Sequence, residues 1–399
     1  MLKAAIIGCG KIADAHAAQI QRIKDCEIIA VCDREELMAK QLFERFRVKQ
    51  YFNSLEDLLE KSRPDVVHVT TPPQSHFIIA RQCLLHGAHV YVEKPFTLDA
   101  GEAAELIGLA ERKGLRITAG HDDQFRHAAL RLRKMVREGF LGGAPVHMES
   151  YYGYEISETS TYAKALLGDK RHWVRALPGQ LLQNIISHGI ARIAEYLTTD
   201  DPQVIAYGFV SPALRQLGET EIVDELRVII SENNQTTAYF TFSSQMRPCL
   251  HQFRIYGPRN GLLLDQDNET LIRLSGQRRK SYLEHFISPV SFAKQYLGNT
   301  TRNLRRFLAN DFHMKSGMNV LIDGLYESIR GNAPVPIPYG EILRTARLMD
   351  AIFGQIRFRP GDSSQKSANY QEIDGHAEGA VFPSVEHRVA RKPLDSHCC

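Results

Sequence analysis

Apolar residues in the first part of the chain come in short runs that alternate with stretches of helical spacing. The runs at 27–33, 65–71, 88–92 and 115–120 predict strands, and the stretches at 35–46, 74–86 and 99–113 predict helices. The strand runs contain few polar residues, as do parallel strands that are buried on both faces. Strands that alternate with helices indicate right-handed crossovers and a doubly wound parallel sheet.

After about residue 120 the pattern changes to successive strands separated by short turns. The predicted strands are 146–154, 203–210, 224–232, 235–243, 251–257, 260–265 and 269–275, and the predicted helices are 125–138, 180–196, 317–331 and 340–356. Adjacent strands joined by short turns favour an antiparallel sheet. We therefore predict an α/β protein with one domain at residues 1–120. A second, α+β domain with an open, mostly antiparallel sheet is predicted at residues 121–357.

The first strand, which begins near Lys3, leads directly into a glycine turn. Gly8, Gly10 and Ala13 form the pattern G-x-G-x-x-A between this strand and a helix. In a dinucleotide-binding turn the first Gly permits the tight bend and the second lets the backbone approach a pyrophosphate. The third small residue lets the helix pack on the strand, and the helix N-terminus offers N–H groups to the phosphates. This stretch predicts a Rossmann domain.

A carboxylate follows the next strand at the distance that such a site requires. Asp33 ends the strand at 27–33, where its carboxylate would accept a hydrogen bond from a ribose hydroxyl, and this favours NAD over NADP. Arg34, the next residue, could instead contact a 2′-phosphate. We therefore expect NAD as the cofactor, with NADP possible.

A lysine that stands at the end of a buried strand is the second chemical signal. Glu93, Lys94 and Pro95 follow the strand at 88–92, and the ends of parallel strands form one crevice. X-Pro bonds can be cis, and a cis bond here would turn the Lys94 ammonium into that crevice. An ammonium in this position can hydrogen-bond a substrate hydroxyl and stabilise a developing alkoxide.

These motifs resemble those of the Gfo/Idh/MocA family, which includes glucose–fructose oxidoreductase and inositol dehydrogenase. The matching residues are Gly8, Gly10, Lys11, Ile12, Ala13, Asp33, Thr71, Pro72, His76, Glu93 and Lys94. The resemblance covers about residues 1–355. It implies an N-terminal Rossmann domain that binds NAD(P) and a second domain that binds a sugar, cyclitol or nucleotide-sugar. It also implies that Lys94 is the catalytic lysine and that all of the matching residues, Lys94 included, lie at the cofactor.

The stretch that leads to His188 resembles the family signature G-G-x-x-x-D-x-x-x-H, with departures. Gly179, Asn184 and His188 take the Gly, acid and His positions, whereas Gln180 replaces the second Gly. On one helix Asn184 and His188 would share a face, and a neutral His can take the proton of a substrate hydroxyl. Asn184 exchanges hydrogen bonds but carries no charge. We therefore expect Lys94 and His188 to move the proton and Asn184 to position the hydroxyl.

Three further side chains are candidates for the substrate side of the crevice. His121 follows the last strand of the first domain, and His172 and Trp173 precede the helix at 180–196. The indole of Trp173 could form a platform for a sugar or contact a diphosphate, or it could pack in the core. The His residues show no local spacing typical of a metal site, so we predict no metal.

Composition then excludes some classes of partner. A net charge of +3 over 399 residues gives no reason to expect nucleic acid. The seven Cys form no C-x-x-C pair, which suits a reducing cytoplasm, and neither a signal peptide nor a membrane span is predicted. Residues 284–312 mix Arg with apolar residues and could meet a membrane surface or an anionic substrate, or form an interface or lid helix. Residues 361–399 are predicted to be disordered.

Together these features predict an NAD(P)-dependent oxidoreductase that transfers hydride between nicotinamide and a secondary alcohol or ketone of a sugar-like compound. The predicted assembly is a homodimer or homotetramer formed through the second sheet, because an antiparallel sheet can offer one face to a partner subunit. Two alternatives stay open. One is a dinucleotide-binding sensor or subunit without activity, which Gln180 and Asn184 suggest, and the other is an NAD-assisted glycoside hydrolase.

Overall fold

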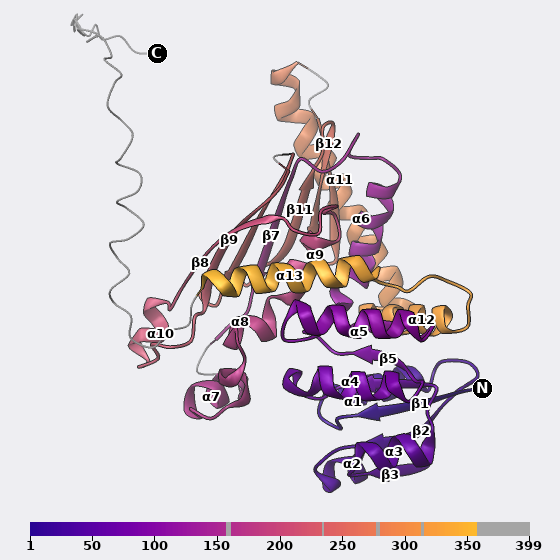
Figure 1. Ribbon diagram of the computed structural model, residues 1–399. Coiled ribbons are helices and arrows are strands. Elements are labelled where there is room, and N and C mark those ends of the chain that lie inside the picture. The colour runs from indigo at the N-terminus through magenta and orange to yellow at the C-terminus, as the bar shows by residue number, and fades with distance from the viewer. Residues whose placement is uncertain (157–160, 234, 277–279, 313–314, 357–399) are drawn as a thin grey trace, which may run out of the picture. The chain divides into compact units, whose positions relative to one another are not determined.

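Six parallel strands form the first sheet, in the order β3-β2-β1-β4-β5-β6 (Figure 1). Their bounds are β1 (Leu2–Ile7), β2 (Cys26–Cys32), β3 (Gln50–Phe52), β4 (Val66–Val69), β5 (His89–Val92) and β6 (Ile117–Ala119). This is the strand order of a doubly wound dinucleotide-binding sheet, so the predicted Rossmann fold is confirmed. The short edge strand β3 was not predicted.

The computed structural model describes residues 1–156, 161–233, 235–276, 280–312 and 315–356. All of these residues fall within one unit of the chain. The segment predicted to be disordered, 361–399, lies outside the described residues. The predicted boundary between two domains at residue 120 stays a prediction.

The helices between the first six strands follow the predicted segments closely. They are α1 (Ala13–Ile20), α2 (Glu36–Phe46), α3 (Leu55–Ser62), α4 (His76–Leu85) and α5 (Ala100–Arg112), with a 3-10 turn, η1 (Pro73–Ser75), before α4. The Ser54 hydroxyl accepts a hydrogen bond from the N–H of Asp57, and the Asp99 carboxylate accepts one from the N–H of Glu102. Both side chains therefore cap their helices.

The second sheet has seven strands in the order β13-β12-β11-β7-β10-β9-β8. The strands are β7 (His147–Gly153), β8 (Gln203–Phe209), β9 (Glu225–Glu232), β10 (Thr236–Ser243), β11 (His251–Tyr256), β12 (Asn260–Asp265) and β13 (Thr270–Ser275). Only β7 and β10 pair in parallel; the other neighbours in this sheet are antiparallel. Along β10, Phe240 and Phe242 are buried and Tyr239 is exposed, so one face of the sheet packs on helices and the other does not.

Helices and 3-10 turns make up the rest of the described chain. They are η2 (Asp122–Phe125), α6 (His127–Arg137), α7 (Thr161–Gly168), η3 (Trp173–Ala176), α8 (Gln180–Ile185), α9 (Ser187–Ala194), α10 (Pro212–Gln216), α11 (Ser281–Leu308), α12 (Ser316–Ile329) and α13 (Tyr339–Gln355). In Figure 1, α13 runs alongside α5 on one side and beneath the strands of the second sheet on the other.

The single helix predicted at 180–196 is wrong, because the structure has two helices, α8 and α9, that meet at Ile186. The backbone carbonyl of Asn184, in the last turn of α8, accepts a hydrogen bond from Nζ of Lys94 at 3.0 Å. The last carbonyls of a helix have no hydrogen-bond donor within the helix, so they can accept a hydrogen bond from a partner outside it. Asn184 and His188 therefore belong to different helices.

The C-terminal helices complete the core of the first sheet. Met318, Leu325 and Tyr326 of α12 are buried in the same apolar cluster as the strands of that sheet. The amide of Gln19 on α1 donates to the Asp323 carboxylate on α12 at 2.8 Å. Residues more than 300 positions apart are thus neighbours in one core.

Candidate active site

A cavity of about 690 Å³ lies at the carboxyl ends of β1, β2 and β4, where ligands bind in sheets of this kind. Of the residues predicted to contact a cofactor, Gly8, Gly10, Asp33, Arg34, Thr71 and Pro72 line it. Gly8 has a φ of +95°, and a Cβ there would lie 2.7 Å from the backbone N of Thr71. The first Gly is therefore required by both its backbone conformation and the space around it.

Gly10 faces open space, since a Cβ placed on it would meet no atom within 4 Å. The N-terminus of α1 beside it has no side-chain cap. An uncapped helix end behind a Gly turn offers N–H groups to an anion, as a bound pyrophosphate requires. The turn and the cavity therefore fit NAD.

The Asp33 carboxylate is held in place at the end of β2. One oxygen accepts a hydrogen bond from the N–H of Cys9 at 2.7 Å, and the other accepts one from the N–H of Glu35 at 2.9 Å. Each carboxylate oxygen can accept a further bond, so the group is still able to receive a ribose hydroxyl. The Arg34 side chain, in contrast, is exposed, with only Glu35 at 4.0 Å.

Six residues that the sequence placed at the cofactor do not line this cavity: Lys11, Ile12, Ala13, His76, Glu93 and Lys94. Ala13 is fully buried, in agreement with close packing of the helix on the strand. His76 is fully buried between two loops, with Nε2 at 2.8 Å from the carbonyl of Thr71 and Nδ1 at 2.9 Å from that of Pro95. His76 thus links the segment of Thr71, which lines the cofactor cavity, to the segment of Lys94 and Pro95.

Glu93 ends a buried chain of polar side chains that the sequence did not reveal. Its carboxylate lies 2.9 Å from Nε2 of His16, whose Nδ1 lies 2.8 Å from Nδ1 of His68, and Nε2 of His68 lies 3.1 Å from the Tyr326 hydroxyl. The hydrogen bond from His16 and the charge of Lys94 lower the pKa of Glu93 to about 2, despite burial. Glu93 therefore stays ionised and anchors the Lys94 loop to α1.

The side chain of Lys94, at the end of β5, contacts a residue from the second domain predicted by the sequence. The Lys94–Pro95 peptide bond is cis, and Nζ of Lys94 donates to the carbonyl of Asn184 at 3.0 Å. Burial lowers the pKa of both His121 and His188, and the charge of the Lys94 ammonium lowers both further, so all three lie in one electrostatic environment. Lys94 therefore meets Asn184 through the Asn184 backbone, and the catalytic roles expected of Lys94, Asn184 and His188 stay predictions.

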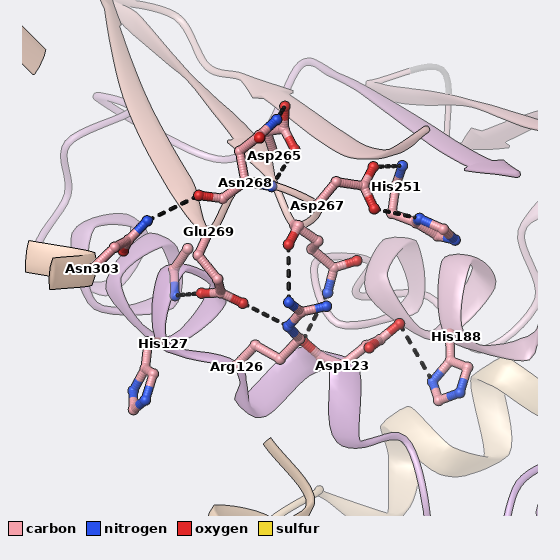
Figure 2. A network of polar contacts seen from close by, with 12 residues as sticks. Asp123, Arg126, His127, His188, His251, Asp265, Asp267, Asn268, Glu269 and Asn303 are labelled. Carbon is pink, nitrogen blue, oxygen red and sulfur yellow. Dashed lines mark hydrogen bonds and ion pairs between the residues drawn. The ribbon is translucent and has the colours of Figure 1, made fainter. Parts of the chain in front are cut away.

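Two carboxylates that the sequence analysis missed lie beside His188. Nδ1 of His188 is 3.8 Å from Oδ2 of Asp123 (Figure 2). It is also 3.9 Å from Oδ1 of Asp122, and both acids belong to η2. Burial lowers the pKa of His188 to about 4, although Asp123 raises it. His188 is 9% exposed, and among the described residues its Nδ1 has no hydrogen-bond partner. It is thus a neutral base that faces two acids.

The two acids differ in their charge. Burial, then the neighbouring Asp123, raises the pKa of Asp122 to about 7. The pKa of Asp123 is lowered, against burial, by His188, Arg192 and Arg126. Tyr152 also donates to Asp123 at 3.4 Å. One carboxylate therefore stays ionised, whereas the other titrates near neutral pH.

Asp122, Asp123 and His188 also have the donor types of a metal site, and their ligand atoms lie within 4.8 Å of one another. The prediction of no metal rested on spacing along the chain and stays a prediction. The position of the two acids directly after a strand end of the first sheet was the signal that could have drawn attention to them.

Of the remaining predicted residues, His121 lies beside His188, with 6.1 Å between ring centroids, whereas Trp173 contacts the cofactor side of the site. His121 is buried, lines a small cavity with Gln183 and Ser187, and has no hydrogen-bond partner for Nε2. His172 stacks on Trp173, with 5.7 Å between ring centroids. Trp173 is 37% exposed, and its carbonyl accepts a hydrogen bond from Gln74, which lines the cofactor cavity.

Comparison with known proteins assigns the first part of the chain. Residues 2–121 match the family model described as "Oxidoreductase family, NAD-binding Rossmann fold", Gfo/Idh/MocA. These residues therefore match a Gfo/Idh/MocA NAD-binding domain. The resemblance read from the Gly turn and Lys94 is confirmed, and so is NAD as the cofactor that the domain is built for.

Three similar proteins show how far the likeness extends. The chain is 32% identical to D-glucoside 3-dehydrogenase of Escherichia coli over 35% of its length and 40% of the relative. It is 32% identical to UDP-N-acetylglucosamine 3-dehydrogenase of Acidithiobacillus ferrooxidans over 37% of its length and 44% of the relative. A dehydrogenase from Bordetella pertussis, solved with NADH and UDP-GlcNAcA, matches 89% of the chain and 95% of its own, with a TM-score of 0.71 and 15% identity.

The sequence matches thus span about two fifths of the length of these curated relatives, whereas the structural match spans nearly the whole fold. The fold shared with the Bordetella pertussis dehydrogenase therefore extends through the second sheet. Among the described residues, no helix has the length and apolar character needed to cross a bilayer.

Proposed function

We propose that the protein is an NAD-dependent dehydrogenase or reductase that acts on a secondary alcohol or ketone of a sugar, cyclitol or nucleotide-sugar. The observation that carries this proposal is the hydrogen bond from Nζ of Lys94 to Asn184, which brings the ammonium at the end of β5 next to the segment that bears His188. The two named relatives act on sugar hydroxyls by their names, which supports this substrate class.

Each residue has a defined role in this proposal. NAD, when bound, accepts or returns the hydride at its nicotinamide ring. Lys94 donates a hydrogen bond to the substrate oxygen and stabilises the negative charge that develops on it. His188, which burial keeps neutral, takes the hydroxyl proton during oxidation and returns it during reduction. Asp123 stabilises the imidazolium that forms, in the manner of a carboxylate beside a catalytic His.

The substrate would lie between the cofactor cavity and the Asp122–His188 centre. Trp173 and His172 offer an aromatic face at this edge, and Gln74 ties them to the cofactor loop. Aromatic faces bind the apolar faces of sugar rings. The assembly of the protein would be a homodimer or homotetramer formed through the free face of the second sheet.

The test is to incubate the purified full chain with NAD and a panel of sugars, cyclitols and nucleotide-sugars and to follow NADH absorbance. We expect NADH to form with at least one compound, and Lys94→Ala to lower kcat by about 10²–10³-fold. Lys113→Ala, at the exposed end of α5, is the matched control and should leave the rate unchanged.

Two results would contradict the proposal. NAD binding without turnover across the whole panel would favour the sensor. Cleavage of a glycoside without net NADH would favour the hydrolase.

A further inference from the structure

A groove of about 500 Å³ lies outside the candidate active site, between α6, α11 and the edge strand β13. None of the residues that line it lines the cofactor cavity. Its charged lining residues are Arg131, Lys134 and Glu138 at α6, Arg273 on β13, and Lys294 and Arg302 on α11. Five cations thus face one carboxylate, although the chain as a whole is nearly neutral.

The walls of the groove are fixed by amide side chains of α11. Gln295 accepts a hydrogen bond from the N–H of Arg273 at 2.8 Å. Asn299, which is fully buried, exchanges hydrogen bonds with the backbone of Leu271 and accepts one from Arg131 at 2.9 Å. α11 therefore covers the free edge of β13. These hydrogen bonds hold together the three elements that carry the cations.

The positive charge of the groove has little internal compensation. Glu138 lies 3.7 Å from Lys134, and both side chains are exposed. Within the ranges that the structure describes, Arg131, Arg273, Lys294 and Arg302 form no ion pair with a carboxylate.

The electrostatics of Arg131 agree with this geometry. Burial, followed by the charges of Arg302 and Arg306, lowers the pKa of Arg131 to about 10. Cations that repel one another in this way are stabilised by an anion placed between them.

We propose that this groove is a binding site for a phosphate-bearing ligand with at least two negative charges. Planar guanidinium groups on three elements suit phosphate oxygens, which they bind through paired N–H groups. The volume is that of a small-molecule pocket. The same chemistry is offered by a free phosphorylated compound and by the headgroup of an anionic lipid.

The outer face of α11 is the reason to test a lipid source. Phe286, Val290, Leu297, Leu304 and Leu308 are exposed and recur at helical spacing, on the face opposite Gln295 and Asn299. Exposed apolar residues beside cations are typical of helices that lie on membrane surfaces. The sequence analysis gave residues 284–312 several possible roles: contact with a membrane surface, binding of an anionic substrate, or an interface or lid helix.

The experiment uses the full chain saturated with NAD, so that the glycine turn does not compete for the probe. Pyrophosphate binding is measured by calorimetry, and sedimentation with vesicles that contain phosphatidic acid is compared with sedimentation with neutral phosphatidylcholine vesicles. We expect Arg273→Gln with Lys294→Gln to raise the Kd of whichever probe binds by about tenfold or more. Arg305→Gln, on the same helix but outside the groove, should leave the Kd unchanged.

The outcomes are distinct. Pyrophosphate binding that is lost in the double variant assigns the site to free phosphorylated compounds. Binding to phosphatidic acid vesicles alone, lost in the same variant, assigns it to lipid headgroups. Absence of binding to either probe, or binding that the double variant retains, would overturn the proposal. Both substituted residues are exposed, and thermal melting of each variant checks that it is folded.

Discussion

The carboxyl group of Asp122, which titrates near neutral pH, lies beside His188, the proposed base of the candidate active site. Burial, then Asp123, raises its pKa to about 7, so it loses a proton as the pH rises through this value. The negative charge that appears favours proton acceptance by His188, which lies 3.9 Å away. We expect kcat/KM for oxidation to rise by about tenfold as the pH passes through about 7.

The pH profile of two variants tests this assignment. Asp122→Asn should flatten the step, since the amide does not titrate. Asp200→Asn removes an exposed carboxylate 3.6 Å from Arg347 and should keep the step. An unchanged profile in Asp122→Asn would refute the role of this carboxyl.

Metal removal tests the second possible use of the same three side chains. Asp122, Asp123 and His188 could hold a cation by distance alone, but the proposed chemistry needs His188 as a base with a free nitrogen. We expect dialysis against EDTA to leave kcat unchanged and the protein to contain no stoichiometric metal by elemental analysis. A loss of activity that Zn²⁺ or Mg²⁺ restores would show a metal centre instead.

The sequence predicted those site residues whose role follows from local geometry. Gly8, Gly10 and Asp33 line the cofactor cavity because strand ends and turns are short-range features. Asp122 and Asp123 carry no motif, and their proximity to His188 depends on how η2 meets α9. Glu93 was placed at the cofactor, whereas its carboxylate binds His16, a partner 77 residues away.

At the scale of an element, the turn between β1 and α1 contains two glycines, Gly8 and Gly10, that are needed for different reasons. Gly8→Ala would place a Cβ 2.7 Å from the Thr71 backbone in a left-handed conformation. We expect a loss of about 2–4 kcal/mol in the free energy of unfolding, because both strain and overlap oppose the folded state. Chemical denaturation measures this loss.

Gly10→Ala is the matched comparison at the same turn. Its Cβ would meet no protein atom within 4 Å, so we expect the free energy of unfolding to change by less than about 1 kcal/mol. The methyl group would occupy space that the pyrophosphate approaches, and the Kd for NAD should rise by about tenfold or more. Equal stability losses in the two variants would contradict this distinction.

Strands, caps and most helices were predictable because periodicity and capping residues are local. The break between α8 and α9 was not, since the residue that engages the Asn184 carbonyl is Lys94, 90 positions earlier. The parallel pairing of β7 with β10 within an otherwise antiparallel sheet is also set by tertiary packing. Both features depend on contacts that no window of sequence contains.

At the scale of the whole molecule, the second sheet leaves an apolar face exposed. Ile205 and Tyr207 of β8 are 66% and 67% exposed, and Ile229 and Tyr239 of the neighbouring strands are also exposed. Contiguous apolar patches of this kind mark protein–protein interfaces. We expect Tyr207→Glu with Ile229→Glu to convert the predicted homo-oligomer to a monomer.

Sedimentation velocity measures that change. Leu217→Glu alters an exposed apolar residue just after α10, off the strands of this face, and serves as the control. A wild-type protein that is monomeric at micromolar concentration would contradict the predicted assembly.

The packing of α12 on the first sheet has a consequence for how the chain is made. A ribosome releases the N-terminal strands first, yet Met318, Leu325 and Tyr326 of their core are added only after some 300 residues. Until then, buried polar groups such as His68 lack the Tyr326 hydroxyl that they bind. The core of the first sheet is thus begun by the earliest strands and completed only when α12 has been synthesised.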